Sequence, residues 1–432
     1  MAEHEEKRLA EMIKTPGREM VERSSTQVSA WAPLREPLFR SMWLAAIVSY
    51  IGTWMQAVGA GWMMTMISSS PLMVGLVQAA VALPVFLVIL PAGALADIVD
   101  RRRFLLITQG WMVLAAGALG VMTLLHVVTP WVLLGFTFLL GLGAVMNDPA
   151  WQAITPELVP PEQHAAAVAL NSAGFNVARA VGPALGGMVI ARAGSGVAFL
   201  LNALSFFGVI LVLYWWRRPQ PTERPRESVW EAIGTGVRYV RGSEVVKAVL
   251  VRTGAFSVGA IALLALLPIL ARPYGPTGYG ALLGCFGVGA LIGATLLPRL
   301  RRNFSVDGLV GAAIVIFAAM TFLAGRVGDF TQMVVVMAVA GGAWIGILAC
   351  LNTAAQLMSP SWVRARSLSM YLLVLQGGMA VGSTLWGALA TRIGLRDTML
   401  CSAVALVLGL GTIRRHRLSA RHLEMSPSVV RD

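Results

Sequence analysis

Charged side chains are scarce in this sequence of 432 residues. They make up 13% of it, roughly half the share that soluble globular domains carry. Between Glu162 and Glu223 there is no acidic residue at all. Because a soluble domain of this length covers its surface with charged and polar side chains, these absences exclude an ordinary soluble enzyme or binding module.

The usual motifs of cofactor and metal chemistry are also missing. Three cysteines occur, Cys285, Cys350 and Cys401, and their spacing fits neither a disulfide framework nor a metal site. No lysine-containing phosphate loop is present, so the sequence does not support ATP-driven transport. No serine–histidine or paired-acid arrangement points to an enzyme. We therefore expect a protein that is not an enzyme and needs no cofactor or metal.

Long apolar runs dominate the sequence instead. Hydrophobic residues are 57% of the chain, and runs of ~20 residues, each long enough to cross a bilayer, recur from Met42 to Ile413. Backbone groups in lipid must be satisfied within the protein, so the runs predict an all-α integral membrane protein. We expect twelve transmembrane helices in two six-helix halves: a cytoplasmic tail over 1–38, a bundle over 39–216, a cytoplasmic linker over 217–244, a second bundle over 245–413 and a cytoplasmic tail over 414–432.

The formal charge of +13 comes from arginines that gather in alternate loops. They occur at 101–103, 217–218, 299–302, 364–366 and 414–415, whereas the opposite loops hold single basic residues such as Arg272 and Arg326. Under the positive-inside rule this asymmetry places both termini in the cytoplasm of a multi-pass protein of the inner (plasma) membrane. No basic domain stands apart from the spans, so we expect no nucleic-acid partner.

The two halves match when the sequence is shifted by 200 positions. Glycine-rich apolar sequences can match by chance, but here arginines register as well as glycines. Each half has an even number of expected spans, so the repeats share one orientation, which suits alternating access with the site between the halves. The positions that match are Gly93, Arg101, Arg102, Gly182, Gly187, Arg192 and Gly194, which fall on Gly293, Arg301, Arg302, Gly382, Gly387, Arg392 and Gly394.

Residues 171–187 combine two different faces in one expected span. Glycine or alanine recurs every fourth residue from Gly174, which makes a stripe where a neighbouring helix can approach closely. Arg179 follows Ser172 and Asn176 on another face. An arginine inside a bilayer is costly, so that face must meet protein or a water-filled cavity. The expected helix-packing residues are Gly174, Gly182, Pro183, Gly186 and Gly187.

Asp148 is the one acid well inside an expected span, apart from Asp97 at a span boundary. As a buried carboxyl group it could exchange a proton for substrate, with Arg179 as a candidate partner. The alternative is a wetted residue at a helix end beside Pro149. Neutral polar and aromatic groups within the spans describe a cavity for bulky amphipathic molecules, although each could equally bond between helices. The candidate cavity residues are Trp54, Gln56, Asn147, Asn176, Arg179, Gln356 and Gln376.

Several stretches resemble the major facilitator superfamily, and the resemblance covers about residues 39–413. Residues 93–103, Gly-Ala-Leu-Ala-Asp-Ile-Val-Asp-Arg-Arg-Arg, look like its signature between the second and third helices, with Ile98 and Asp100 as departures. Residues 182–187, Gly-Pro-Ala-Leu-Gly-Gly, resemble the fifth-helix motif associated with proton-coupled exporters. Residues 171–183 also look like the branch called transmembrane secretion effectors. Where many relatives place a basic residue two positions after the proline, this chain has Trp151.

The first of these motifs suggests a conformational latch. Asp97 lies where the second helix leaves the membrane, four residues after Gly93. We expect it to form a charge cluster with Arg101, Arg102 and Glu157 that holds the halves in the outward-facing state. The alternative is that the arginines only fix the topology.

These features predict a secondary active transporter that exports an amphipathic, drug- or siderophore-like molecule by alternating access, coupled to protons. Its expected partners are the small-molecule substrate, protons and the lipid bilayer, and we expect a monomer. The alternatives are a lysophospholipid transporter or an importer of the same fold, or, from other classes, a membrane sensor or an intramembrane enzyme. A sensor would need a sizeable soluble domain, whereas the tails are short and basic.

Overall fold

A computed structural model describes residues 29–216, 243–357 and 364–412. Throughout these ranges the chain is helical and contains no strand, as the sequence predicts. The first half holds η1 (Ala32–Arg35), α2 (Pro37–Ile67), α3 (Pro71–Ile98), α4 (Arg101–Leu124), α5 (Pro130–Ile154), η2 (Thr155–Leu158), η3 (Pro161–Gln163) and α6 (His164–Trp215). The second half holds α8 (Glu244–Leu270), η4 (Arg272–Tyr274), α9 (Gly275–Asn303), α10 (Val306–Ala324), α11 (Phe330–Leu357), α12 (Arg364–Ile393) and α13 (Leu395–Gly409).

The 52-residue helix α6 consists of two antiparallel segments joined at Gly194. A straight helix of that length would span about 78 Å, far more than a bilayer of about 30 Å. Gly194 breaks the helix with φ 81° and ψ 168°, a conformation essentially restricted to glycine. Gly182 lies against Trp54 of α2, and beyond the break Phe199 lies against Gly59 while Asn202 lies back at Gly52. The second segment of α6 therefore runs along α2 in the direction opposite to the first.

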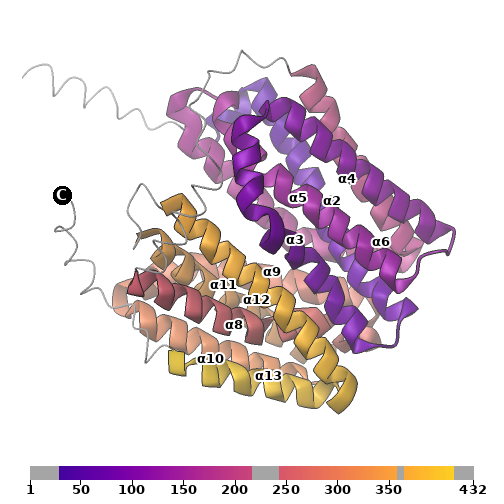
Figure 1. The fold of residues 1–432 in the computed structure, drawn as a ribbon, viewed down its shortest axis with the longest axis vertical. Coiled ribbons are helices and arrows are strands. Elements are labelled where there is room, and N and C mark those ends of the chain that lie inside the picture. The colour runs from indigo at the N-terminus through magenta and orange to yellow at the C-terminus, as the bar shows by residue number, and fades with distance from the viewer. Residues whose placement is uncertain (1–28, 217–242, 358–363, 413–432) are drawn as a thin grey trace, which may run out of the picture.

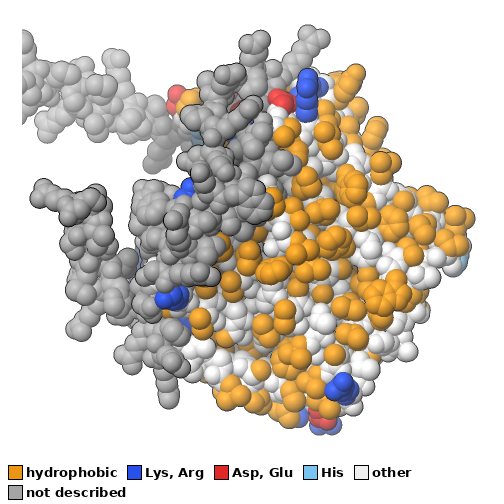
Figure 2. Space-filling view, in the orientation of Figure 1, with side chains coloured by type: hydrophobic (Ala, Val, Ile, Leu, Met, Phe, Trp, Pro, Cys, Tyr) orange, Lys and Arg blue, Asp and Glu red, His pale blue; other side chains and the backbone are white. Residues whose placement is uncertain are grey.

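Ten helices in the described ranges are long and apolar enough to cross a membrane. Eleven α-helices are present there, and α6 contributes two segments, which makes twelve helical segments; that all twelve cross the membrane stays a prediction. The last helix, α13, has 15 residues and is shorter than the others. Figure 2 shows apolar side chains spread over one face of the molecule, with charged groups at its margins. Such a surface is suited to lipid rather than to water.

Local sequence explains where several of these helices begin. The side chains of Asp100, Thr129, Ser243 and Ser305 each accept a hydrogen bond from the backbone N–H three residues later. Each therefore satisfies one of the N–H groups that a helix leaves unpaired at its first turn. Aromatic packing supports the second half, where the rings of Phe256, Phe317 and Trp344 have their centroids within 6 Å of one another. The first half is built around α2, which contacts both segments of α6.

The two halves form separate bundles that touch along two symmetric helix pairs, α6 with α9 and α3 with α12 (Figure 1). At the first pair, Gly187 lies against Gly280 and the carbonyl of Pro276; at the second, Gly387 lies against Leu72 and Gly75. Gly187 and Gly387 are 200 positions apart, as the sequence repeat requires. The predicted repeat is therefore visible in the contacts between the halves.

Candidate functional site

The candidate site is an arginine held between aromatic rings where the two halves meet. The Arg179 guanidinium, on the first segment of α6, lies 6.0 Å from the ring centroid of Trp54 on α2. It lies equally far from Phe286 on α9, which belongs to the other half. A cation over aromatic faces is stabilised by the ring quadrupoles, more so where water is scarce. Arg179 therefore meets protein from both halves, and this is how the fold accommodates an arginine inside a span.

Two further aromatic side chains extend this cluster within the first half. Phe175, one turn before Arg179, has its ring centroid 5.3 Å from that of Tyr50 in an edge-on arrangement. It lies 6.4 Å from that of Trp54. The cluster thus has four aromatic rings from three helices: Trp54 and Phe286 lie beside the guanidinium, and Phe175 lies next to Trp54 and Tyr50. A flat apolar group could stack on these rings.

Asp148 lies near the end of α5. Its side chain is exposed, because α5 packs against α2, α3 and α4 of its own half and leaves this side chain uncovered. The Asp148 carboxylate is close enough to act electrostatically on the Tyr50 hydroxyl. The acid therefore belongs to the same region as the aromatic cluster, and its coupling to protons stays a prediction.

The remaining candidate cavity residues are spread more widely. Gln56 is buried inside the first half, where it accepts a hydrogen bond from Asn202 at 3.4 Å. Asn147 accepts one from Gln109 at 3.0 Å and so joins α5 to α4. Asn176 is half-buried and donates to the Ser172 carbonyl within its own helix.

On the second half, Gln356 is exposed near the end of α11 and donates to Asn352 one turn earlier. Gln376 is half-buried on α12. The structure thus brings Trp54 and Arg179 together with Phe175 and Phe286, whereas Gln56 and Asn147 bond between helices of one bundle. The cavity residues predicted from the sequence include neither Phe175 nor Phe286, although Phe286 falls 200 positions after Phe86. That match is a signal that could have identified it.

The small-residue stripe of α6 brings two neighbouring helices into backbone contact. A Cβ built on Gly174 would meet Ile47, one on Gly182 would meet Trp54, and one on Gly186 would meet the Cα of Met55, all within 3 Å. A Cβ on Gly187 would meet the Pro276 carbonyl of α9. Any larger side chain at these positions would push α6 away from α2 or from the other half.

The carbonyl of Pro183, beside this stripe, lies against Gly280 of α9. The same end of the molecule carries a polar contact between the halves. Arg272, in η4, donates to the carbonyls of Thr65 at 2.7 Å and Ser68 at 3.3 Å. These carbonyls belong to the last turn and C-cap of α2, where a cation also meets the negative end of the helix dipole. Trp62 of α2 stacks on Tyr279 of α9 nearby, with centroids 6.4 Å apart. We call this set of contacts, together with the two glycine pairs, the seam.

Part of the expected charge cluster lies at the opposite ends of the helices. Arg101 forms an ion pair with Glu157 at 2.8 Å and donates to the Ala153 carbonyl at 3.1 Å. Arg102 donates to the carbonyls of Leu213 and Tyr214, at the end of α6. The Asp97 side chain and the surroundings of Gly93 lie outside the described part of the structure, so the acid's place in a latch stays a prediction.

The second half repeats this arginine contact. Arg301 donates to the Thr353 hydroxyl at 3.4 Å, and both residues are 200 positions after Arg101 and Ala153. Position 357 carries leucine where the first half has Glu157. Both halves thus share an arginine contact to the equivalent helix, α5 in the first half and α11 in the second, whereas the ion pair of Arg101 belongs to the first half.

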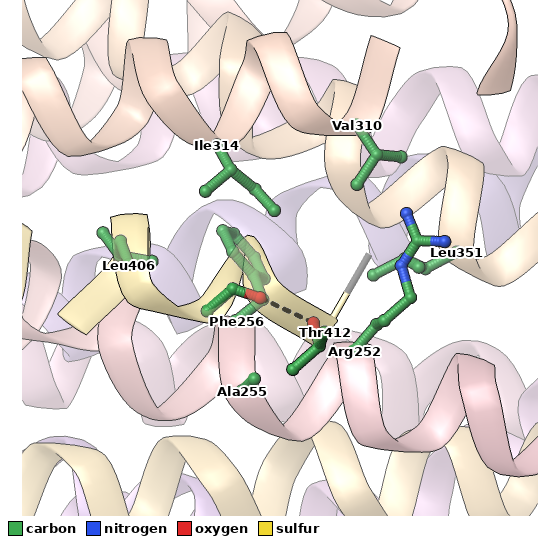
Figure 3. A pocket seen from close by; sticks show the side chains of 9 residues that line it. Arg252, Ala255, Phe256, Val310, Ile314, Leu351, Leu406 and Thr412 are labelled. Carbon is green, nitrogen blue, oxygen red and sulfur yellow. Dashed lines mark hydrogen bonds between the residues drawn. The ribbon is translucent and has the colours of Figure 1, made fainter. Parts of the chain in front are cut away.

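One ion pair of the second half is not predicted by the sequence. Arg252, on α8, is buried and lies 2.6 Å from Asp307, in the first turn of α10. A cavity of about 10 Å³, roughly the size of one water molecule, lies beside it. Figure 3 shows its lining, with Phe256, Ile314 and Leu406 opposite the arginine stem. Arg252 falls early in an apolar span, and the sequence offers no obvious signal that pairs it with Asp307.

Two bundles that repeat about one axis, and meet around an arginine and aromatic rings, define a transporter of the major facilitator superfamily. The family described as transmembrane secretion effector matches residues 28–430, and the chain belongs to this family. The chain is therefore a multi-pass membrane transporter and not an enzyme.

Curated relatives carry names of the same kind. The Staphyloferrin A transporter of Staphylococcus aureus is 28% identical over 39% of this chain, and the match spans less than half, 43%, of that protein. The Multidrug efflux pump Tap of Mycolicibacterium fortuitum is 27% identical over 89% of this chain and 97% of its own length. The Enterobactin exporter EntS of Escherichia coli is 26% identical over 91% and 96%.

Solved structures share the fold. A bacterial homolog of the human lysosomal transporter Spinster, in an inward-facing and unoccupied conformation, has a TM-score of 0.73. The match covers 90% of this chain and 98% of that one at 16% identity.

Proposed function

We propose that this protein exports amphipathic small molecules across the inner membrane by alternating access, in exchange for protons. The observation that carries the proposal is the seam: α6–α9 and α3–α12 close one end of the molecule directly beside the Arg179 cluster. Repeats of like orientation that touch at one end around a polar group are the arrangement expected for rocking bundles.

The seam also indicates which side is closed. Its residues lie at the starts of α3 and α9 and toward the end of α12. The arginine-rich segments 101–103 and 299–302 lie at the opposite ends of these helices. Under the positive-inside rule the arginine-rich end faces the cytoplasm together with both termini. The described conformation would then be closed to the outside and ready to receive substrate from the cell.

The chemistry of the cluster favours a particular substrate class. Trp54, Phe175 and Phe286 offer apolar faces, and Arg179 offers a fork of N–H donors that suits a carboxylate or a phenolate. A molecule with both aromatic and polar parts would use both. The names of the relatives, two siderophore transporters and a multidrug efflux pump, support the same class.

Asp148 is the proposed proton carrier. It is exposed in the conformation closed at the seam, and its charge lies near the Tyr50 hydroxyl beside the aromatic cluster. Rocking of the bundles would change its exposure to water and hence its tendency to hold a proton. One chain supplies both bundles and the whole cluster, so the proposed working unit is a monomer.

Proteoliposomes with an imposed pH gradient test the proposal, with ethidium and enterobactin as the two probes. We expect proton-driven flux of at least one probe by the wild type, loss of proton dependence in Asp148→Asn, and loss of flux in Arg179→Ala. Gln56→Leu is the matched control, because Gln56 is buried within one bundle. If wild-type flux does not depend on the pH gradient, the proposed proton coupling is wrong. If the probes move toward the cytoplasmic side instead of away from it, the protein is an importer.

A further inference from the structure

A deep groove opens on the outer side of the second half, away from the seam. Its volume is about 660 Å³, within the range of small-molecule sites. Helix α11 forms the floor, with Ala338, Gly342 and Gly346, while α9 and α10 form the walls. α9 turns Gly280, Gly284 and Gly287 toward α6. The groove residues Ile292, Leu296 and Leu300 lie on the opposite face of α9, which is the one that meets lipid.

The groove is deep because α9 and α11 touch through their backbones. A Cβ on Gly289 would overlap the Ala338 carbonyl, and one on Gly293 would lie 2.8 Å from the Cα of Gly342. α10 also packs on α11 but contacts α9 only weakly. Most side chains on the walls are apolar and exposed; Ile292, for example, is 53% exposed, whereas Leu297 is buried. A narrow apolar slot therefore runs along the bundle.

The two ends of the groove differ in charge. At the end formed by Leu300, Phe304 and Gly308, helix α9 finishes with Arg299, Arg301 and Arg302. Arg299 and Arg302 are exposed. Helix α10 starts at the same place, so the positive end of its dipole also lies there. No charged residue lines the groove itself along its described length.

We propose that this groove binds a phospholipid with an anionic headgroup, drawn from the leaflet at the arginine-rich end. One acyl chain fills the slot between α9 and α10, and the headgroup lies at the end of α9, near Arg299. Lipid tails gain nothing from leaving other lipid, so binding at such a site depends on close packing and on headgroup charge. The groove provides the close packing, and the arginine-rich end provides the positive charge for the headgroup.

Native mass spectrometry of the purified full-length protein tests this inference independently of transport. Phosphatidylglycerol and phosphatidylcholine are the two probes, added after delipidation in detergent. We expect phosphatidylglycerol to be retained and phosphatidylcholine to be lost. Ala312→Trp fills the groove from the α10 wall and should abolish retention, whereas Ala319→Trp, exposed on the same helix but outside the groove, should not.

Two further variants keep the test decisive if Ala312→Trp does not fold. Gly346→Leu fills the groove from its floor, where a Cβ has only Ala313 as a neighbour, at 4.0 Å. Arg299→Gln with Arg302→Gln should weaken phosphatidylglycerol binding by about fivefold for each arginine lost, while Arg40→Gln, exposed on the other half, should not.

Equal retention of phosphatidylglycerol by Ala312→Trp and Ala319→Trp would overturn the site, and equal retention of the two lipids by the wild type would overturn the role of charge. Light scattering on the same samples tests whether a second copy of the chain occupies the groove instead. If the wild type is a dimer and Ala312→Trp is a monomer, the groove is an interface between copies of the chain and the lipid proposal fails.

Discussion

Gly194 and Gly394 adopt the same unusual backbone conformation, with φ of 81° and 82° and ψ of 168° and 167°. They lie 200 positions apart, and each ends one long helical segment and begins the next. Since this region of φ and ψ is essentially open to glycine alone, two such residues in register indicate that both halves make the same turn. The turn is part of the repeat, as are the Arg101 and Arg301 contacts.

Replacement of Gly194 by alanine should therefore destabilise the protein. A Cβ at this position would have no neighbour within 4 Å, so the cost is that of the backbone conformation, about 1–3 kcal/mol. Gly135→Ala is the control, since a Cβ there is equally unobstructed but lies inside helix α5. Thermal unfolding in detergent should show a lower midpoint for Gly194→Ala only. Equal midpoints would contradict the strain argument.

Gly280 tests the close approach of α9 to α6. A Cβ there would overlap the Pro183 carbonyl, so Gly280→Ala must push the helices apart. With the native cysteines replaced and Ala184→Cys as reporter, we expect a membrane-impermeant maleimide to react several-fold faster when Gly280→Ala is added. Gly110→Ala, with open space around its Cβ, should leave the rate unchanged. An unchanged rate with Gly280→Ala would mean that the glycines do not close this end.

Arg272 tests the polar part of the seam. Arg272→Ala removes both hydrogen bonds to the end of α2 and should increase labelling of the Ala184→Cys reporter. Arg272→Lys keeps the charge near the helix dipole but loses the guanidinium fork, so its effect should be intermediate. Arg326→Ala is the control, because that arginine stacks on Phe322 of its own half. The idea fails if Arg272→Ala and Arg326→Ala behave alike.

The ion pair of Arg252 and Asp307 should contribute to the stability of the second half. Asp307→Asn leaves a charged arginine facing a neutral partner in a buried position, at a cost of about 3 kcal/mol, the low end for such pairs because Asp307 remains partly exposed. Adding Arg252→Met to Asp307→Asn should restore much of the loss. Thermal unfolding of the single and double variants measures this. A double variant no more stable than the single one would contradict the electrostatic explanation.

The sequence was sufficient to predict the helices because their apolar patterns are long and periodic. Apolar runs, arginine-rich loops and the shift of 200 positions predicted the spans, the halves and their like orientation. The site was harder to predict, because the sequence does not show which polar side chains contact one another. Gln56 and Asn147 look like cavity residues in the sequence, but they bond to Asn202 and Gln109.

Contacts between distant positions explain the other differences. Arg272 looked like a lone loop residue, and its partners at Thr65 and Ser68 are more than 200 positions away. Phe286 reaches Arg179 only because glycines let α9 approach α6. Asp148 is exposed because the other half leaves the end of α5 uncovered in this conformation, and no local pattern contains that information.

A reversible crosslink across the seam tests the central claim, that the halves must separate there during transport. A Cβ on Gly284 would lie 3.6 Å from that of Ala184, which suits a disulfide between Ala184→Cys and Gly284→Cys in a background without native cysteines. The matched control is Gly117→Cys with Ala203→Cys, at 3.9 Å, which joins two helices of the same half.

The measurement is pH-driven flux of ethidium or enterobactin in proteoliposomes, before and after oxidation. We expect oxidation to stop flux in the pair that spans the seam and reduction to restore it, whereas the pair within one half should transport in both states. Undiminished flux through a fully crosslinked seam would contradict the central claim.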